Sequence, residues 1–407
     1  MARPLRPLFC LCLARSLSLA VLLLWAPGLR AAAALPPVGH VFVIVLENEG
    51  YDRTFGPKTE APYLAQALPK QGALLTQYFG TGHNSLDNYL AMISGQAATP
   101  ETRDDCGVFA DFVQTGTTPD GQAIGRGCVY PASVKTLADQ LSAAKLAWRG
   151  YMEDMGNDPK REAAACGHAP IGQKDPTQRA ESPADAPPKG DQYAARHDPF
   201  VYFHSVLDGP DCATNVIPLD RLAADLKSAE TTPVFSFITP NLCHDGHDEP
   251  CISGKTSGLA AVDAFLKHWV PVITASPAYR TDGLLIVTFD ESDARSVAAK
   301  PGGGQLVTFS GASCCHQQPG PNLGPFPQHE TYRTAEIVMQ SFGGDRIGAV
   351  LLLPFIKPGT VSRTPYNHYA LLRSVEDLLH LDGHLGYAGQ AGLAGFGNDI
   401  FTKPRGK

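Results

Sequence analysis

Two long apolar runs in this chain each end directly in acidic residues. His40–Leu46 is followed by Glu47-Asn48, and Gly283–Phe289 is followed by Asp290-Glu291. Continuous β-branched and aliphatic runs of this length indicate strands that are buried on both faces of a parallel sheet. In open α/β sheets the functional crevice lies beyond the carboxyl ends of the strands, so oxygen ligands from two such ends can converge on one hard cation. The pattern predicts a metal-assisted hydrolase.

The rest of the chain alternates strand and helix signals, which favours a layered α/β fold. We find no internal repeat and no linker, so we expect a single domain over residues 36–407. Two segments rich in Gly, Pro and polar residues, near 157–191 and 301–328, are predicted to be surface excursions. We also expect strands at 147–151, 233–238 and 348–356, and helices at 61–69, 87–93, 134–144, 219–227, 260–273 and 369–381.

The first 35 residues have the features of a signal peptide. Arg3 and Arg6 precede a short apolar segment at 17–25, and the alanines at 31–34 offer a cleavage site. A membrane anchor is the alternative, because residues 8–29 are largely apolar, but Arg15 interrupts that stretch. No later stretch is long enough to span a bilayer. We therefore expect a secreted or periplasmic protein with no stable membrane span.

The charge balance argues against nucleic acid as a partner. The chain has 33 Lys and Arg residues against 40 Asp and Glu residues, and no basic run follows the predicted signal peptide. Binding to a phosphate backbone requires a positive face.

The cysteines predict disulfide bonds. Of ten cysteines, Cys10 and Cys12 lie in the predicted signal peptide, which leaves an even number for an exported protein. Proximity favours the pairs Cys106–Cys128, Cys166–Cys212 and Cys243–Cys251, while the adjacent Cys314 and Cys315 either form a vicinal bridge or pair elsewhere. A zinc site of four cysteines is the alternative, but no C-x-x-C pair supports it.

The acids after the two runs have competing interpretations. Clustered carboxylates such as Asp290, Glu291 and Asp293 repel one another unless protons or a cation neutralise them, which favours a metal. A solvated loop or a helix start with acids in its first turn would give the same pattern. Glu47-Asn48 alone would suit an ordinary turn. Because the two pairs occupy equivalent strand ends, a shared metal site is the stronger interpretation.

A serine at the predicted start of a helix is the candidate nucleophile. Ser85 lies in the segment 82–89, where free backbone amides and the helix dipole favour an anion. Asn88, one turn later, is placed to bind a phosphoryl oxygen. An N-cap serine is the alternative, and is favoured by the spacing alone.

Histidines and acids also gather in loops. The segment 240–248, which follows a predicted strand, contains Asp245 and His247 and suits a second metal, proton transfer or phosphate binding. A disulfide-pinned surface loop is the alternative. His197 and His368 stand near turns, and each alone is better explained as structural.

Together these segments resemble the bacterial and fungal phosphoesterase family that contains acid phosphatases and phosphatidylcholine-type phospholipases C. The matching motifs include Leu46-Glu47-Asn48, His83-Asn84-Ser85 and Asp290-Glu291, and they occur in the family's order. They cover most of the predicted mature chain, at 43–48, 83–95, 196–200, 240–248, 288–291 and 366–378.

The resemblance implies an alkaline-phosphatase-like fold, with a doubly wound, mostly parallel sheet, helices on both faces and loop insertions. It implies that a hydroxyl bound to one divalent metal ion, of unknown identity, attacks phosphorus, and by position this is Ser85. The remaining implied roles are metal binding by Glu47, Asn48, Asp290 and Glu291, phosphoryl binding by Asn88, assistance to the phosphate or leaving group by His247 with Asp245, and support by His197 and His368.

Four residues depart from the family's pattern. Asn84 and Asp87 replace prolines, His244 stands where Asn is common, and Glu291 is longer than the usual Asp. We expect Asp87 to add negative charge beside an anionic substrate. The proposed hydroxyl and metal ligands are nevertheless all present.

The expected activity is hydrolysis of small phosphomonoesters through a phosphoserine, as in acid phosphatases. A phospholipase C that acts on phospholipid head groups is the first alternative, although no apolar insertion is evident. A sulfatase is disfavoured, because no Cys-x-Pro-x-Arg segment is present. A phosphate-binding protein without catalysis is the remaining alternative.

Overall fold

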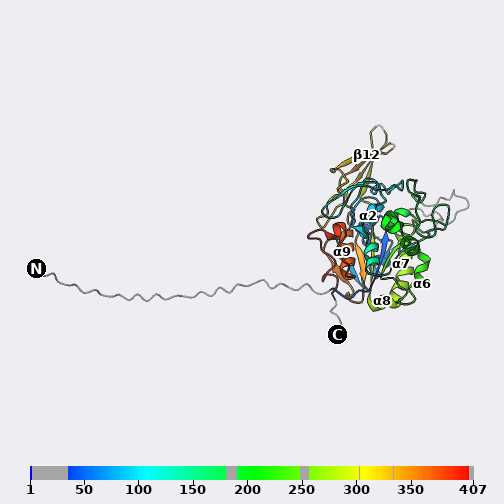
Figure 1. The fold of residues 1–407 in the computed structure, drawn as a ribbon, viewed down its shortest axis with the longest axis vertical. Helices are drawn as coiled ribbons and strands as arrows, with labels where there is room; N and C mark the ends of the chain where they lie inside the picture. Colours follow the sequence, from blue (N-terminus) through cyan, green and yellow to red (C-terminus); the bar gives the residue numbers. More distant parts are fainter. Residues whose placement is uncertain (2–34, 180–189, 248–255, 302, 333, 403–407) are drawn as a thin grey trace. The chain divides into compact units, whose positions relative to one another are not determined.

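The two apolar runs form neighbouring strands in the middle of a sheet (Figure 1). β1 (His40–Leu46) and β9 (Gly283–Phe289) pair in parallel from His40 beside Gly283 to Leu46 beside Phe289. Every residue of β9 and all of β1 except His40 are buried, as expected for strands covered on both faces. Because the two strands share one direction and one register, Glu47 and Asp290 emerge at the same edge.

The computed structural model describes residues 1, 35–179, 190–247, 256–301, 303–332 and 334–402. The predicted signal peptide therefore lies almost entirely outside the described residues. Residues Leu35–Lys407 group into one unit. Within the described part of the chain, no helix has the length and apolar character needed to cross a bilayer.

The central sheet has eight strands and is mostly parallel, as predicted. Only β14 (Ala349–Leu352) runs antiparallel to its neighbours. The first strand of the chain lies inside the sheet, with later strands on both sides of it, which is the doubly wound arrangement. The order is β15 (Thr360–Ser362), β2 (Ala73–Leu75), β14, β9, β1, β8 (Phe235–Thr239), β6 (Trp148–Met152) and β7 (Val216–Pro218).

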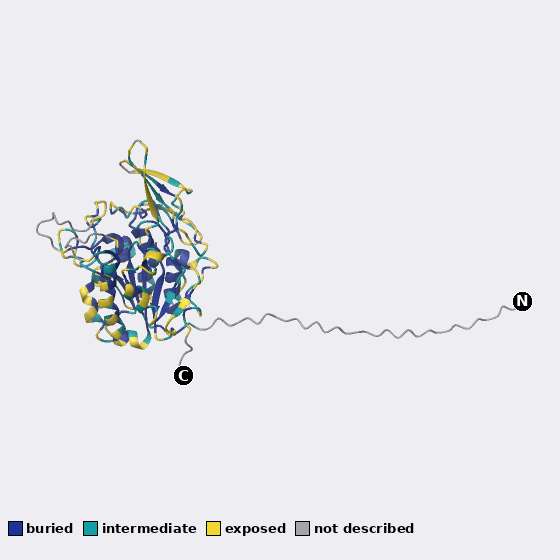
Figure 2. Cartoon of the chain, turned by 180° about the vertical axis from the view of Figure 1, so that it is seen from behind, coloured by how far each residue is buried: buried dark blue, intermediate teal, exposed yellow. Residues whose placement is uncertain are grey.

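Helices flank the strands (Figure 1). α2 (Ser85–Ser94) packs against α9 (His368–Leu378), which lies to the left of the sheet in Figure 1, whereas α7 (Gly258–Ala275) and α8 (Pro277–Asp282) lie to the right. In Figure 2 the strands of the central sheet are mostly buried and the exposed residues concentrate on the periphery. The sheet is therefore covered as a doubly wound fold requires.

Local signals set the helix ends. α3 (Leu137–Ala143) begins with a capping box between Thr136 and Asp139, and α9 begins at Asn367, whose side chain accepts the Ala370 amide hydrogen. α2 ends at Gly95, which adopts a left-handed conformation with φ 66° that favours glycine. The shorter α-helices are α1 (Tyr51–Thr54), α4 (His204–Leu207), α5 (Asp211–Asn215) and α6 (Leu222–Asp225).

Two predicted helices are less regular than expected. The predicted helix at 61–69 is a π-helical segment, Tyr63–Ala67, and the one at 219–227 is a 3-10 turn, Leu219–Arg221, followed by α6. Further 3-10 turns are Ala195–His197, Pro199–Tyr202 and Gly386–Gly389. Two small two-stranded sheets pair β3 (Tyr78–Phe79) with β16 (Tyr366–Asn367) and β4 (Val113–Thr117) with β5 (Ala123–Arg126).

The predicted surface excursion at 301–328 is not all loop, because it contains a strand. β11 (Gln305–Phe309) belongs to a four-stranded sheet, hereafter the small sheet, with β10 (Arg295–Ala299), β12 (Gln328–Tyr332) and β13 (Ala335–Met339). All of β10 is exposed and β11 is mostly half-buried. Strands with so little burial carry no continuous apolar run, so the Gly- and Pro-rich composition dominated the prediction.

The disulfide predictions are confirmed where the structure describes both cysteines. Cys106 bonds to Cys128, Cys166 to Cys212, and the adjacent Cys314 and Cys315 to each other. Cys243 is also disulfide-bonded, and Cys251, its predicted partner, lies outside the described residues. Disulfides of this number are typical of proteins from an oxidising compartment.

A buried acid on α9 makes stability depend on pH. Burial raises the pKa of Glu376 from 4.5 to about 8, while one of its carboxylate oxygens accepts the Leu385 amide hydrogen at 2.9 Å. Because the pKa is raised in the folded state, unfolding releases protons, and the contribution of Glu376 to stability falls as pH rises from 4.5 to about 8.

We therefore expect Glu376→Gln to stabilise the protein at pH 8 by about 1–3 kcal/mol, since one pKa unit corresponds to about 1.4 kcal/mol. At pH 4 the gain should vanish. Urea unfolding at both pH values measures the effect. Glu60→Gln removes the same charge at an exposed position and is the control. An equal gain for Glu376→Gln at both pH values would contradict the argument.

Candidate active site

Ser85 is the first residue of α2 and points at the end of β1. Its hydroxyl donates to Oε2 of Glu47 at 2.7 Å, and both residues are buried. Asn84, just before the helix, has φ 72°, a strained value for a residue other than glycine. Its side chain donates to the carbonyl of Arg103. The strained turn and the hydrogen bond fix the hydroxyl at a helix N-terminus, a position that favours anions.

Asn88 holds that turn from behind. Its Oδ1 accepts hydrogen bonds from the backbone amides of Thr81 at 2.7 Å and Gly82 at 3.0 Å, and its Nδ2 donates to the carbonyls of Gly82 and Asn84. Asn88 is fully buried and both ends of its amide are occupied by the turn. The structure thus gives Asn88 a positioning role, and its predicted contact with a phosphoryl oxygen stays a prediction.

Three residues after β1 and β9 form a linked group around Ser85. The Asn48 side chain donates to Glu47 Oε2 at 2.9 Å, and its backbone amide donates to Asp290 Oδ1 at 2.9 Å. Asn48 has φ 55°, which turns the chain sharply after β1. The predicted convergence of Glu47, Asn48, Ser85 and Asp290 is therefore present in the structure.

The second oxygens of the two acids remain unsatisfied. Glu47 Oε1 and Asp290 Oδ2 are buried and have no hydrogen-bond donor among the described residues. Burial raises the pKa of Glu47 to about 7, and burial together with the charge of Glu47 raises the pKa of Asp290 well above its usual range. Two buried acids with spare oxygens require protons or a cation to balance them.

His197 lies between two acids. Its Nε2 is 3.4 Å from Glu47 Oε1 and its Nδ1 is 3.7 Å from Asp245 Oδ2, while its ring stacks on Tyr89 with centroids 5.2 Å apart. Burial lowers the pKa of His197 well below its usual value, so the ring is neutral near pH 7. The structure therefore brings His197 into the group, although the sequence alone favoured a structural role.

The loop after β8 folds back over the end of β1. The carbonyl of Asp245 accepts the Glu47 amide hydrogen at 2.8 Å, and Asp245 Oδ1 accepts the His247 amide hydrogen at 2.9 Å. Gly246 has φ 112°, a conformation that favours glycine and permits this return. His244, by contrast, lies with Nδ1 3.0 Å from Glu153 Oε1, and is not among the residues that line the pocket of Ser85.

Glu291 lies beside a buried histidine, and Asp87 is itself buried. Glu291 Oε2 is 3.5 Å from Nδ1 of the buried His83, whose Nε2 accepts the Gly311 amide hydrogen. Burial lowers the pKa of His83 to about 4. Burial also raises the pKa of Asp87 well above its usual range. Burial thus favours the neutral form of Asp87, and the predicted negative charge beside the substrate stays a prediction.

The His368 side chain supports the backbone of Asp290. Its Nε2 donates to the Asp290 carbonyl at 2.5 Å, and its Nδ1 is 3.2 Å from the Tyr78 hydroxyl. Burial lowers the pKa of His368 to about 4. The predicted supporting role agrees with this position.

A pocket of about 80 Å³ opens beside Ser85. Four predicted residues line it, namely Asn48, Ser85, His247 and Glu291. Its other walls are Asn84, Asp105, Ser292, Asp293, Arg295 and Phe309. Of these, sequence reasoning named Asp293 as part of the acidic cluster and Asn84 only as a departure from the family pattern, and it missed the rest. Arg295 and Phe309 come from the small sheet, none of whose strands was predicted. Asp105 follows no apolar strand, and its only signal is a pair of acids before a cysteine.

The residues fit a metal only if amide and hydroxyl oxygens complete the ligand set. Among the residues that the structure describes, no three His, Cys, Asp or Glu side chains form a ready metal cage. The candidate set instead joins Glu47 and Asp290 with Asn48 and Ser85. Hard cations accept such mixed oxygen ligands.

The family model described as Phosphoesterase family matches residues 57–382, which is most of the chain. The chain belongs to the phosphoesterase family. The match includes Ser85, His197, Asp245, His247 and Asp290, whereas Glu47 and Asn48 precede it. Glu47 and Asn48 are connected to the site by their hydrogen bonds to Ser85 and Asp290, and not by the family match.

Curated relatives are acid phosphatases and a lipid phosphatase. A probable acid phosphatase of Kluyveromyces lactis is 24% identical over 85% of this chain and 60% of the relative, and a phosphate-repressible acid phosphatase of Penicillium chrysogenum is 26% identical over 56% and 43%. A phosphatidylinositol-3-phosphatase of Mycobacterium tuberculosis is 26% identical over 71% and 73%. The chain thus spans 60% and 43% of the length of the two fungal relatives.

Solved structures are more distant. A protein in the alkaline phosphatase superfamily from Vibrio parahaemolyticus has a TM-score of 0.46 and 12% identity, over 92% of this chain and 72% of that chain. This similarity is too low to add to the family assignment.

The role of Asn88 leads to a mutational prediction. Asn88→Ala should cost about 1–3 kcal/mol of stability, because the turn loses several buried hydrogen bonds. Any activity that depends on Ser85 should fall on the order of 10²-fold, since a small misplacement of a reacting group has that effect.

Thermal melting and turnover of p-nitrophenyl phosphate measure the two effects. Asn322→Ala is the matched control, because the Asn322 side chain also binds loop backbone, at Gly125 and Ala123, but does not line the pocket. It should lose stability and keep activity. Full activity in folded Asn88→Ala would remove the positioning role.

Proposed function

We propose that this protein is an exported metal-dependent phosphomonoesterase of the acid phosphatase type, with Ser85 as its nucleophile. The observation that carries the proposal is the 2.7 Å hydrogen bond from the Ser85 hydroxyl to buried Glu47 at the N-terminus of α2. A hydroxyl with an adjacent carboxylate at a helix N-terminus has the parts that attack on phosphorus requires. The fungal acid phosphatase relatives support the same class of reaction.

In the first step the Ser85 oxygen bonds to phosphorus and its proton passes to Glu47. The bond between phosphorus and the ester oxygen breaks, and the departing oxygen takes a proton from His247, which lines the pocket. In the second step the water oxygen bonds to phosphorus and gives one proton to His247, the bond between Ser85 and phosphorus breaks, Ser85 takes its proton back from Glu47, and phosphate leaves. His197 and Asp245 orient Glu47 during both steps.

Glu47, Asn48 and Asp290, with Ser85 and Glu291 beside them, would hold one divalent metal ion. When bound, it would neutralise charge on the phosphoryl oxygens and lower the pKa of the Ser85 hydroxyl. The two unsatisfied buried oxygens, Glu47 Oε1 and Asp290 Oδ2, support this assignment. The metal's identity stays open, because oxygen ligands discriminate poorly among Mg, Ca, Mn, Fe and Zn.

Two features of the chain support export of the protein. The disulfides Cys106–Cys128 and Cys166–Cys212 suit an oxidising compartment. The predicted signal peptide at 1–35 would deliver the chain there. We therefore place the protein outside the cytoplasm, secreted or periplasmic.

A lipid phosphate is the second candidate substrate. The relative from Mycobacterium tuberculosis is described as a phosphatidylinositol-3-phosphatase. The small volume of the pocket, about 80 Å³, fits a phosphoryl group and leaves the rest of the substrate outside. Phosphomonoesters of lipid head groups therefore remain compatible with the same chemistry.

Removal of the nucleophile tests the proposal directly. Ser85→Ala should lower hydrolysis of p-nitrophenyl phosphate by at least about 10³-fold without loss of folding, since nucleophile removal in hydrolases has effects of that order. Ser94→Ala removes a hydroxyl from the other end of α2, where it donates to Leu90, and should keep activity. Near-normal turnover by folded Ser85→Ala would refute the assignment.

Removal of the metal tests the ligand set. A chelator should abolish turnover, and a divalent cation should restore it. The same cation should raise the Tm of the wild-type protein by several degrees, because ligands that bind only the folded state stabilise it. Asp290→Asn should lose most of that rise. If the wild type neither turns over nor melts differently with any cation, a phosphate-binding protein becomes the better description.

A further inference from the structure

Asp105 occupies a position in the pocket that no part of the proposed reaction uses. It lines the pocket with Ser85, and its Oδ1 accepts the amide hydrogen of Leu86, in the first turn of α2, at 3.0 Å. Amides in the first turn of a helix are donors that commonly bind phosphate. A carboxylate of the protein itself therefore occupies one donor at the place where a phosphoryl oxygen would bind.

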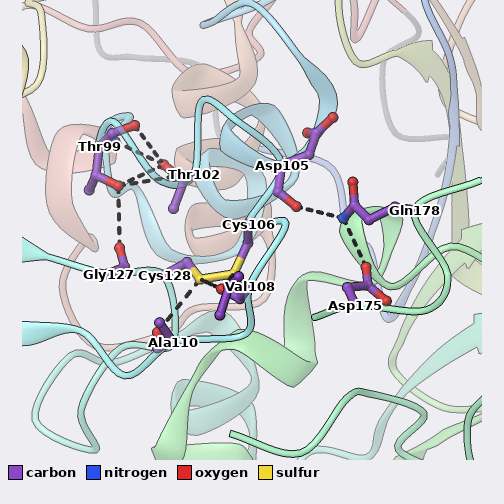
Figure 3. The surroundings of a disulfide bond; sticks show 10 residues. All are labelled: Thr99, Thr102, Asp105, Cys106, Val108, Ala110, Gly127, Cys128, Asp175 and Gln178. Atoms are coloured by element: carbon purple, nitrogen blue, oxygen red, sulfur yellow. Dashed lines mark hydrogen bonds between the residues drawn. A yellow bond between two sulfur atoms is a disulfide. The ribbon is translucent and has the colours of Figure 1, made fainter. Parts of the chain in front are cut away.

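The backbone around Asp105 is held firmly. Asp105 has φ 49°, an unusual value for this residue type, and its amide donates to the Thr102 carbonyl at 3.2 Å. Its carbonyl accepts the Gln178 side chain at 2.8 Å. The next residue, Cys106, is tied to Cys128, and Figure 3 shows the Asp105 carboxylate pointing away from that bridge. The loop thus presents the carboxylate to the helix.

The Asp105 carboxylate also lies near a buried arginine side chain. Its Oδ2 is 3.8 Å from Nε of Arg196, a side chain that is 7% exposed. A guanidinium of this kind is a strong partner for phosphate oxygens. Asp105 therefore engages an amide of α2 and lies beside the Arg196 guanidinium, which also donates to the Gln178 carbonyl at 3.2 Å.

We propose that Asp105 is a specificity-determining residue that competes with the phosphoryl group for the N-terminus of α2. This inference rests on the proposed function, because it takes the pocket beside Ser85 as the phosphoryl site. Binding of a dianionic phosphoryl group requires the Asp105 side chain to leave the Leu86 amide. That cost weakens the binding of both substrate and phosphate product, so it limits product inhibition and favours release.

Two other roles for Asp105 predict different results. If it only caps α2, loss of its charge changes stability and leaves phosphate binding unchanged. If it is a proton donor in the reaction, its replacement by Asn lowers kcat and leaves the affinity for phosphate unchanged. Competition predicts tighter phosphate binding, because the repulsive charge is removed and the Leu86 amide becomes available.

The test is calorimetric titration of the full protein with inorganic phosphate, at fixed pH and divalent cation. Asp105→Asn should bind phosphate at least about fivefold more tightly than the wild type. The KM for p-nitrophenyl phosphate and the inhibition constant of phosphate should fall by a similar factor. Asp104→Asn is the matched control, because it removes the same charge from the adjacent exposed residue and should leave the phosphate affinity unchanged.

Each result decides the question. Unchanged or weaker phosphate binding by Asp105→Asn overturns the proposal, as does an equal gain in Asp104→Asn. If Asp105→Asn melts far below the wild type, Asp105→Gly replaces it, since glycine tolerates the positive φ. Tighter phosphate binding in a protein without phosphatase activity would uphold the role of Asp105 and remove the proposed function. Normal phosphatase activity with unchanged phosphate affinity would uphold the proposed function and remove the role of Asp105.

Discussion

The parallel register of β1 and β9 is the constraint on which the site depends. Because Leu46 pairs with Phe289, the next residues, Glu47 and Asp290, leave the sheet side by side. The backbone of Asn48 then joins them by its hydrogen bond to Asp290. A slip of one residue would set one acid beside the last apolar residue of the other strand, so the observed register fixes the position of the acids.

Much of the fold and of the candidate site could be predicted from the sequence. The residues that were missed were missed for physical reasons. Continuous burial gives β1 and β9 an unmistakable apolar pattern, so their ends were predictable. Asp105 and Arg295 were not, because they reach the pocket through a disulfide-held loop and an exposed strand. Tertiary contacts place such residues, and no periodicity marks them. The burial of Asp87, which favours its neutral form, could not be predicted for a related reason, since no sequence pattern marks it.

The buried histidines show that the site is organised around neutral imidazoles and unsatisfied carboxylates. His197 and His368 have lowered pKa values because of burial, so near neutral pH they cannot balance the charge of Glu47 and Asp290. Their contribution is geometric, through the Glu47 side chain and the Asp290 carbonyl. The balance of charge must come from protons or a bound cation, which is the physical reason to expect metal dependence.

The small sheet is also part of this organisation, although it lies outside the central fold. Arg103, whose carbonyl binds Asn84, makes side-chain contacts with Gln328 and Glu330 of β12. The loop after β11 adds two further contacts, from Gly311 to His83 and from Gln317 to the Thr81 carbonyl at 2.6 Å. The turn before Ser85 is therefore held by Asn88 from within and by these contacts from the side of the small sheet. An insertion that looks dispensable by composition thus fixes the geometry of Ser85, the proposed nucleophile.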